Sequence, residues 1–242
     1  MSARALRQAG WEVRLLLRNG EQLLLTFVIP VALLLGLGLT SLMPDAYGRY
    51  RVSQALATVL TVSVISAAFT SLAIATGFER RSGALRFLGT TPLSRVELLV
   101  GKGLATMLVT ALSAAVVAIA AVVIGWRPSP PTLWAPLLIV LGTAAFAACG
   151  VALAGLLRAE AVLAIANGLF LALILFGGVI IPVTSLPGPL ATIAPWLPSG
   201  ALAEALTQVV VDGQFPDLGS ILVLAGWLVV GTTVSARTFR WS

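Results

Sequence analysis

Charged residues are scarce in this chain. Of its 242 residues, 15 are Lys or Arg and nine are Asp or Glu, so 10% are charged, whereas a soluble domain carries about 25%. Hydrophobic residues make up 59%, and the mean hydropathy is +1.04. So few charges cannot cover a surface that faces water. The composition therefore predicts an integral membrane protein whose solvent is the lipid bilayer.

Histidine is absent, and cysteine occurs once, at position 149. A single cysteine cannot form a disulfide within the chain, and a Cys/His metal site would lack its ligands. Cys149 lies in the apolar run 137–157, where we interpret it as a small packing residue. We expect no metal and no other cofactor in this chain.

The phosphate-binding motif G-x-x-x-x-G-K-[ST] is also missing. The nearest string is Gly101-Lys102-Gly103, which lacks the first glycine of the motif and the hydroxyl residue after the lysine. We interpret Lys102 as an interfacial lysine beside small packing residues. The chain is therefore not expected to be an enzyme with its own ATPase site.

Long apolar runs dominate what is present. A bilayer core requires about 20 apolar helical residues, and six runs qualify, at 22–42, 53–77, 98–125, 134–157, 161–182 and 218–236. We predict one all-α membrane domain over 1–242 with six transmembrane helices. The cores of these runs contain no Asp, Glu, Lys or Arg, which argues against a proton-coupled secondary transporter, because such carriers keep ionisable residues inside their spans.

The basic residues predict the orientation. Six spans put both termini and the 78–97 loop on one side of the membrane. That side holds twelve basic residues, Arg4, Arg7, Arg14, Arg18, Arg80, Arg81, Arg86, Arg95, Lys102, Arg158, Arg237 and Arg240, and the other side holds Arg49, Arg51 and Arg127. Lys and Arg favour the cytoplasmic side, so we expect both termini there. The net charge of +6 then reflects topology and contact with anionic lipid, and not a nucleic-acid partner.

Residues 1–21 have the pattern of an amphipathic helix. One stripe consists of Arg4, Arg7, Trp11, Arg14 and Arg18, and the opposite one of Leu6, Ala9, Val13, Leu16 and Leu17. This pattern predicts a helix that lies in the plane of the lipid headgroups. A cytosolic helix packed on a partner protein is the alternative.

The most charged stretch is residues 79–102, ERRSGALRFLGTTPLSRVELLVGK. Residues 79–88 are predicted to form a short helix that a glycine ends and Pro92 prevents from continuing. Ser94 and Glu97 then match a capping box, S-x-x-E, directly before the third apolar run. The residue pattern leaves two interpretations open, a docking element or a solvated turn.

Five prolines fall within the 17 residues 182–198, which begin at the last residue of the fifth apolar run. Broken helix at membrane depth is tolerated only where protein or a water-filled cavity buries it. We therefore predict a re-entrant hairpin over 187–212 that enters from the outside, turns near 195–198 and leaves by a helix over 200–211, which Gly213 caps. An ordinary hydrophobic extracellular loop is the alternative.

Two blocks of residues carry a family resemblance. The first is Glu79-Arg80, Gly83, Leu85, Leu88, Thr91-Pro92-Leu93-Ser94-Arg95, Leu98-Leu99 and Gly101-Lys102. The second is Asn167-Gly168-Leu169, Phe176-Gly177-Gly178-Val179, Pro182, Leu186-Pro187 and Ala194-Pro195-Trp196-Leu197-Pro198. With the six-run layout, the chain resembles over essentially its whole length the ABC transporter type 2 permeases, in particular the membrane proteins of daunorubicin-resistance and multidrug exporters.

This resemblance implies a cytoplasmic coupling helix at 79–89 that docks on a separate ATP-binding cassette subunit. Its contact residues would be Glu79, Arg80, Arg81, Gly83, Leu85, Arg86, Phe87, Leu88, Thr91 and Pro92. Two copies of that subunit would bind ATP and Mg, and a second permease, the same or a sister chain, would complete the transporter. Because topology alone places arginines in a cytoplasmic loop, a loop without a partner is the alternative.

The resemblance also implies a transport route. Residues that would line it are Ser63, Ser66, Thr70, Asn167 and Phe170, and residues of an outer gate are Pro182, Pro187, Pro195, Trp196, Pro198 and Glu204. Hydroxyl and amide side chains in membranes also bond helix to helix, which is the alternative for the first set. Glu204 would alternatively be a polar position on a short external helix or a proton site.

The function implied is that of the permease subunit of an ATP-driven exporter in the bacterial cytoplasmic membrane. Its route would carry no fixed charge, which suits a lipophilic or amphiphilic compound such as a drug, an antibiotic or a lipid-like molecule, as in multidrug efflux. The alternatives are a proton-coupled secondary transporter and a member of the same family that exports polysaccharide or lipid.

Overall fold

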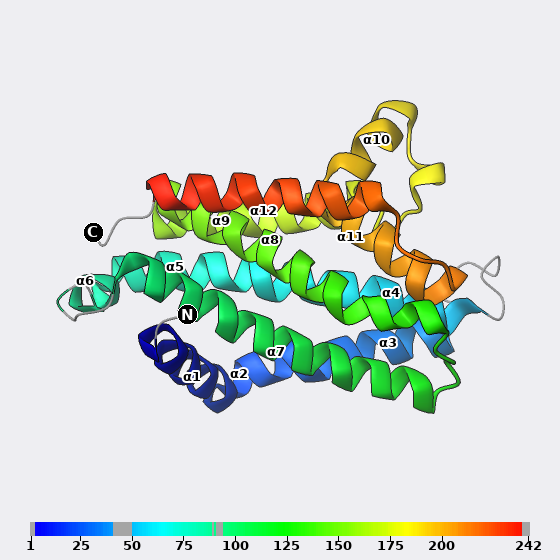
Figure 1. Ribbon diagram of the computed structural model, residues 1–242, viewed down its shortest axis with the longest axis horizontal. Helices are drawn as coiled ribbons and strands as arrows, with labels where there is room; N and C mark the ends of the chain where they lie inside the picture. Colours follow the sequence, from blue (N-terminus) through cyan, green and yellow to red (C-terminus); the bar gives the residue numbers. More distant parts are fainter. Residues whose placement is uncertain (1–2, 41–49, 89, 91–93, 239–242) are drawn as a thin grey trace.

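The computed structural model describes residues 3–40, 50–88, 90 and 94–238, and every regular element in these ranges is helical. The long helices run side by side along the long axis of the molecule, while α1 (Ala3–Arg18) crosses one end of the bundle (Figure 1). The helix after α1 is continuous over 20–39 and consists of α2 (Gly20–Leu23), a π-helical turn (Leu24–Val28) and α3 (Ile29–Leu39).

Five helices are long and apolar enough to cross a membrane. They are Arg51–Arg81, Val96–Val123, Pro130–Leu156, Ala159–Phe176 and Leu218–Thr238. These ranges agree with five of the six predicted runs. The first predicted run, 22–42, contains a shorter apolar helix, Leu24–Leu39, and ends outside the described residues. The sixth transmembrane span therefore stays a prediction.

The second predicted span is one unbroken helix of 31 residues, made of α4 (Arg51–Val64), a π-helical segment (Ile65–Ser71) and α5 (Leu72–Arg81). It lies at the centre of the bundle, and two thirds of its apolar window is buried. Around it pack α7 (Arg95–Val123), α8 (Ala135–Leu156, after a 3-10 turn Pro130–Trp134) and α9 (Ala159–Phe176). The last long helix, α12 (Leu218–Thr238), packs mainly on α8 and is largely exposed.

Glycines let α8 approach two neighbours closely. A Cβ atom at Gly150 would lie 2.8 Å from the backbone oxygen of Phe69 in the central helix. A Cβ at Gly231 of α12 would lie 2.9 Å from the Cβ of Ala148. Small residues at such positions allow helix backbones to pack tightly in membranes.

The N-terminal helix agrees with most of the predicted amphipathic pattern, although Leu6 of the predicted apolar stripe is 55% exposed. Arg7 and Arg14 are exposed, whereas Ala9, Val13 and Leu16 are partly buried on the side that packs against α7. The helix ends at Arg18, before the predicted boundary at residue 21. Its place in the lipid headgroups stays a prediction, because the structure contains no lipid.

The proline-rich segment differs in part from the prediction. The fifth span ends at Phe176, six residues before its predicted end, and Gly178 then takes a left-handed conformation with φ 75°. The segment continues with a 3-10 turn (Val183–Ser185), α10 (Gly188–Ile193), a second 3-10 turn (Ala194–Trp196) and α11 (Pro198–Thr207), which runs into a π-helical turn (Gln208–Asp212).

Only one arm of the predicted hairpin enters the bundle. α11 packs against α4, α8 and α12, and eight of its ten residues are buried. α10 instead projects from one end of the bundle, and none of its described side chains is buried (Figure 1). The predicted helix over 200–211 is present with slightly wider bounds, and Gly213 caps it in the left-handed conformation (φ 64°), as predicted.

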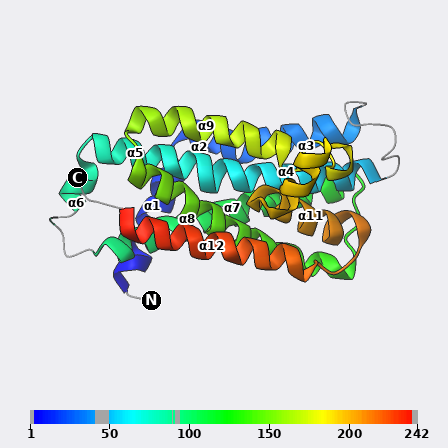
Figure 2. The same ribbon diagram turned by 90° about the horizontal axis from the view of Figure 1, so that it is seen from above.

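The bundle has two distinct ends. The start of α1, the end of α12 and the short helix α6 (Ala84–Leu88) lie at one end (Figure 1). The start of α4 and the connection from α11 to α12 lie at the other end, which Figure 2 also shows. We call these the inner and outer ends, after the predicted orientation. The first and last described helices thus begin and end, respectively, on the side of α6, and the cytoplasmic location of the termini stays a prediction.

Candidate functional site

The charged stretch at the inner end is two helices and not one. α5 continues through Arg81, a turn follows at Ser82 and Gly83, and α6 covers Ala84–Leu88. Gly83 has φ 79°, a left-handed conformation that favours glycine, and the Ser82 hydroxyl donates to the backbone oxygen of Glu79 at 3.1 Å. The single helix predicted over 79–88 is therefore wrong. Helix propensity in this stretch is overridden at the serine–glycine pair.

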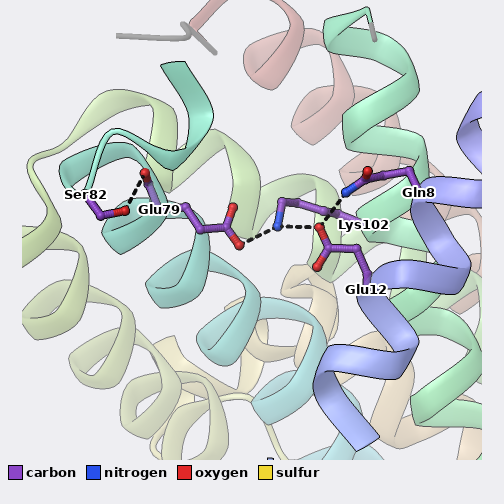
Figure 3. A network of polar contacts seen from close by, with 5 residues as sticks. All are labelled: Gln8, Glu12, Glu79, Ser82 and Lys102. Atoms are coloured by element: carbon purple, nitrogen blue, oxygen red, sulfur yellow. Dashed lines mark hydrogen bonds and ion pairs between the residues drawn. The ribbon is translucent and has the colours of Figure 1, made fainter. Parts of the chain in front are cut away.

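A buried ion cluster joins three helices at this end. The Nζ atom of Lys102 on α7 lies 2.7 Å from Oε1 of Glu79 on α5 and 3.0 Å from Oε1 of Glu12 on α1. The Gln8 amide donates to the same Glu12 oxygen at 2.9 Å (Figure 3). Only 3% of the Lys102 side chain is exposed. This corrects our interpretation of Lys102 as an interfacial lysine, because its amine is enclosed by protein and paired with two carboxylates.

The cluster fixes the three helices to one another. A charge removed from water is costly unless it is paired, and losing one partner of a buried pair destabilises a protein by about 3–5 kcal/mol. Moving α1 or α5 away from α7 would separate Lys102 from one of its carboxylates and would therefore carry that cost. The predicted capping box places the lysine: the Glu97 backbone N–H donates to Ser94 Oγ (3.2 Å) and the Ser94 N–H to Glu97 Oε2 (2.9 Å), so α7 begins two turns before Lys102.

The two arginines after Glu79 bond to other helices of this chain. The Arg80 guanidinium donates to the backbone oxygens of Gly155, at 3.2 Å, and Leu157, at the end of α8. Arg81 forms an exposed ion pair with Glu160 in the first turn of α9. The end of α5 is thus tied to α1, α7, α8 and α9. Three of the four charged residues predicted to contact a partner subunit, Glu79, Arg80 and Arg81, have partners within the chain.

The remaining predicted docking residues differ in how far their side chains are exposed. Phe87 is 73% exposed, whereas Leu85 is fully buried and does not offer its side chain to a partner. Gly83 forms the turn between α5 and α6. Of Arg86 and Leu88 the structure describes only the helical backbone, and Thr91 and Pro92 lie outside the described residues. Contact between this segment and another subunit stays a prediction, with Phe87 as its exposed apolar side chain.

Two cavities extend from the ion cluster into the bundle. A cavity of about 200 Å³ is lined by Glu12, Glu79 and Lys102, and a smaller one of about 20 Å³ lies beside it, with Gln22 and Ser71 lining both. The smaller cavity is lined by residues of both π-helical segments, Leu24–Val28 and Ile65–Ser71, and its other polar lining residues are Thr26, Ser63, Ser66, Thr110 and Ser113. π-helical turns are rare and often lie at functional sites.

The structure brings together only part of the predicted route. Ser63 and Ser66 line the small cavity. Thr70 is buried away from it, Phe170 packs partly buried against the core, and Asn167 is exposed on α9, where its amide donates to the Leu163 backbone oxygen at 2.8 Å. The hydroxyls of this region also bond helix to helix, since Ser113 donates to the backbone oxygen of Thr26. A route between two permeases stays a prediction.

The predicted outer-gate residues lie near the outer end of the bundle. The exposed ones are Pro182, Pro187, Pro195, Trp196 and Glu204, and the buried one is Pro198, the first residue of α11. The Trp227 indole donates to the backbone oxygen of Trp196 at 2.9 Å and so ties this segment to α12. Their role as a gate stays a prediction.

Comparison with known proteins adds two findings. A family model described as ABC-2 family transporter protein matches residues 40–237. The chain is also 25% identical over 228 residues to a protein of Bacillus subtilis (strain 168) named "Putative transport permease YvfS", and that match covers 93% of this chain and 92% of the other protein.

Proposed function

Because this chain belongs to the ABC-2 family of transporter proteins, we propose that it is the permease subunit of an ATP-driven exporter. Membership of the family implies an ATP-binding cassette partner, and this sequence contains no phosphate-binding motif of its own. The proposal places two such partner subunits at the inner end and a second permease beside this one. ATP and Mg would be bound by the partners.

The single observation that carries the proposal is the connection between α6 and the central helix. The helix Arg51–Arg81 is 31 residues, or about 46 Å, long and leads directly into the turn before α6. At its inner end the ion cluster fixes it to α1 and α7. A subunit that bound α6 would therefore displace one of the two most buried long helices of the bundle together with its neighbours.

The contact surface that we propose is narrower than the one predicted from the sequence. Glu79, Arg80 and Arg81 hold the end of α5 in place through bonds within the chain. Phe87 presents a large apolar side chain to the outside. We propose that Phe87 inserts into the ATP-binding subunit and that the three charged residues transmit its movement. Exposed aromatic residues are typical anchors of protein interfaces.

The proposed cargo is a lipophilic or amphiphilic compound, such as a drug, an antibiotic or a lipid-like molecule, and the proposed direction is out of the cell. The proposed location is the bacterial cytoplasmic membrane with both termini inside. The basic inner end supports this orientation.

The test is to purify the chain with the ATP-binding subunit encoded next to it and to measure ATPase activity of the complex. Phe87→Ala should reduce the amount of ATPase that copurifies, because the anchoring ring is lost. Leu133→Ala, which removes an even more exposed side chain from the 3-10 turn before α8 at the outer end, is the matched control and should leave copurification unchanged. Absence of any associated ATPase, or equal association of both variants, would contradict the proposal.

A further inference from the structure

A groove of about 800 Å³ lies between α11 and α12 near the outer end of the molecule. The two helices lie side by side in both views (Figures 1 and 2). The apolar residues that line the groove include Leu222, Val230 and the two tryptophans Trp196 and Trp227. Pockets for small organic ligands have volumes of about 300–1,000 Å³ and are mainly apolar with a few placed polar groups.

The polar groups of the groove are acidic. Glu204 on α11 and Asp217 before α12 both line it, and Gln208 connects them. The Gln208 amide nitrogen donates to Glu204 Oε1 at 3.1 Å, and its oxygen accepts from the Asp217 backbone N–H at 2.7 Å. Neither carboxylate forms an ion pair with a residue in the described part of the chain, and no Lys or Arg is among the described residues that line the groove.

We propose that this groove binds amphiphilic organic cations. The positive group would lie beside Glu204 and Asp217, and the apolar body would lie along α12 toward Val230. The indole rings of Trp196 and Trp227 add to the attraction, because aromatic faces favour cations. An anionic amphiphile, or a phospholipid with its phosphate at this position, would instead meet two carboxylates. The role of the groove as a site for cargo rests on the proposed export function, but binding itself requires only this chain.

The direct test is binding of tetraphenylphosphonium to the full chain in phosphatidylcholine nanodiscs, measured by equilibrium dialysis against empty nanodiscs. Tetraphenylborate serves as the anion of matched shape. We expect saturable binding of the cation, and we expect Glu204→Gln with Asp217→Asn to weaken it about fivefold, since an exposed charge pair contributes modestly. Asp212→Asn, at the same end of the molecule but outside the groove, should bind the cation as the unmodified chain does.

A second variant fills the groove without changing its charge. Gly226 lines it, and a Cβ atom there would meet no atom within 4 Å, so Gly226→Leu should occupy the space and abolish binding. Gly168→Leu is the control, because Gly168 on α9 is equally open and lies outside the groove. Binding that survives Gly226→Leu, or that is unchanged in the double carboxylate variant, would overturn the proposal.

Three further outcomes show which of the two proposals fails. Equal binding of tetraphenylborate would show an apolar groove without charge preference and would also overturn the cation assignment. If the ATP-binding subunit copurifies but the cation does not bind, the groove assignment fails while the permease proposal stands. If the cation binds but no ATP-binding subunit copurifies, the permease proposal fails while the groove assignment stands.

Discussion

Acidic residues at the two ends of the bundle are used in opposite ways. At the inner end, Glu12 and Glu79 enclose the buried amine of Lys102, and the three side chains belong to three different helices. At the outer end, Glu204 and Asp217 line an open groove and form no ion pair among the described residues. The carboxylates that fix helices at the inner end are already neutralised by a lysine of the same chain. The carboxylates of the outer groove have no such partner among the described residues, so their charge is available to a ligand.

The two pairs of carboxylates differ in burial, and burial determines how much the loss of a charge changes stability. A buried ion pair is sensitive to the loss of one member, because the remaining charge stays in a medium that solvates it poorly. An exposed carboxylate keeps its water, so its removal changes stability little. Substitutions in the inner ion cluster should therefore lower stability, whereas substitutions of the groove carboxylates should change only binding.

The largest effect is expected from Lys102→Met. Glu12 and Glu79 would then share a site without a cation, which should lower the free energy of unfolding by about 3–5 kcal/mol. Thermal unfolding of the purified chain in detergent measures this loss. Adding Glu12→Gln and Glu79→Gln should restore most of it, because no unpaired charge remains. A single variant that unfolds at the same temperature as the unmodified chain would show that the cluster does not anchor the bundle.

A smaller effect is expected from Glu12→Gln. Lys102 keeps Glu79, but α1 loses its ionic bond to α7, so we expect a loss of about 1–3 kcal/mol. Hydrogen exchange should localise this loss, with faster exchange of the amides in α1 and unchanged exchange in α8. Uniformly faster exchange in both helices would mean that α1 is not held separately by this contact.

Arg81→Met tests a charged contact that is exposed at the same end. The side chains of Arg81 and Glu160 are 59% and 63% exposed, so the loss of their ion pair should cost less than about 1 kcal/mol. Thermal unfolding should barely shift, and the small shift should vanish at high salt because exposed pairs are screened. A loss as large as that of Lys102→Met would remove the distinction between buried and exposed pairs.

The smallest effect on stability is expected from Glu204→Gln with Asp217→Asn. Glutamine and asparagine keep the shapes of the side chains, and both positions are exposed, so the unfolding free energy should change by less than about 0.5 kcal/mol. Cation binding should nevertheless weaken in the same preparation. Unfolding and dialysis of one sample thus compare stability with binding directly.

Local features of the fold were predictable from the sequence. The structure contains both the capping box at Ser94 and Glu97 and the left-handed cap at Gly213. Each depends only on residues that lie within a few positions of one another in the chain. Five of the membrane helices follow from apolar run length. The turn at Gly83 was missed because helix-forming neighbours on both sides outweighed one glycine in the prediction.

The ion cluster was beyond the reach of sequence reasoning, because its members are 67 and 23 residues apart along the chain and meet only when three helices pack. One signal was available. Gln8 and Glu12 are four residues apart and lie beside the apolar stripe of an otherwise basic helix, which indicates a polar contact on the packed side. The groove was also unpredictable, since it depends on how α11 and α12 come together.

The close packing of α8 has a mechanical consequence. Its small residues bring it within direct contact of the central helix at Gly150 and of α12 at Gly231, with no long side chains between the backbones. Long side chains absorb small displacements by changing rotamer, whereas backbone contacts cannot. We therefore expect α8 to act as a stiff spacer: a shift of the central helix, begun at the inner end, would move α12 and change the width of the groove at the outer end.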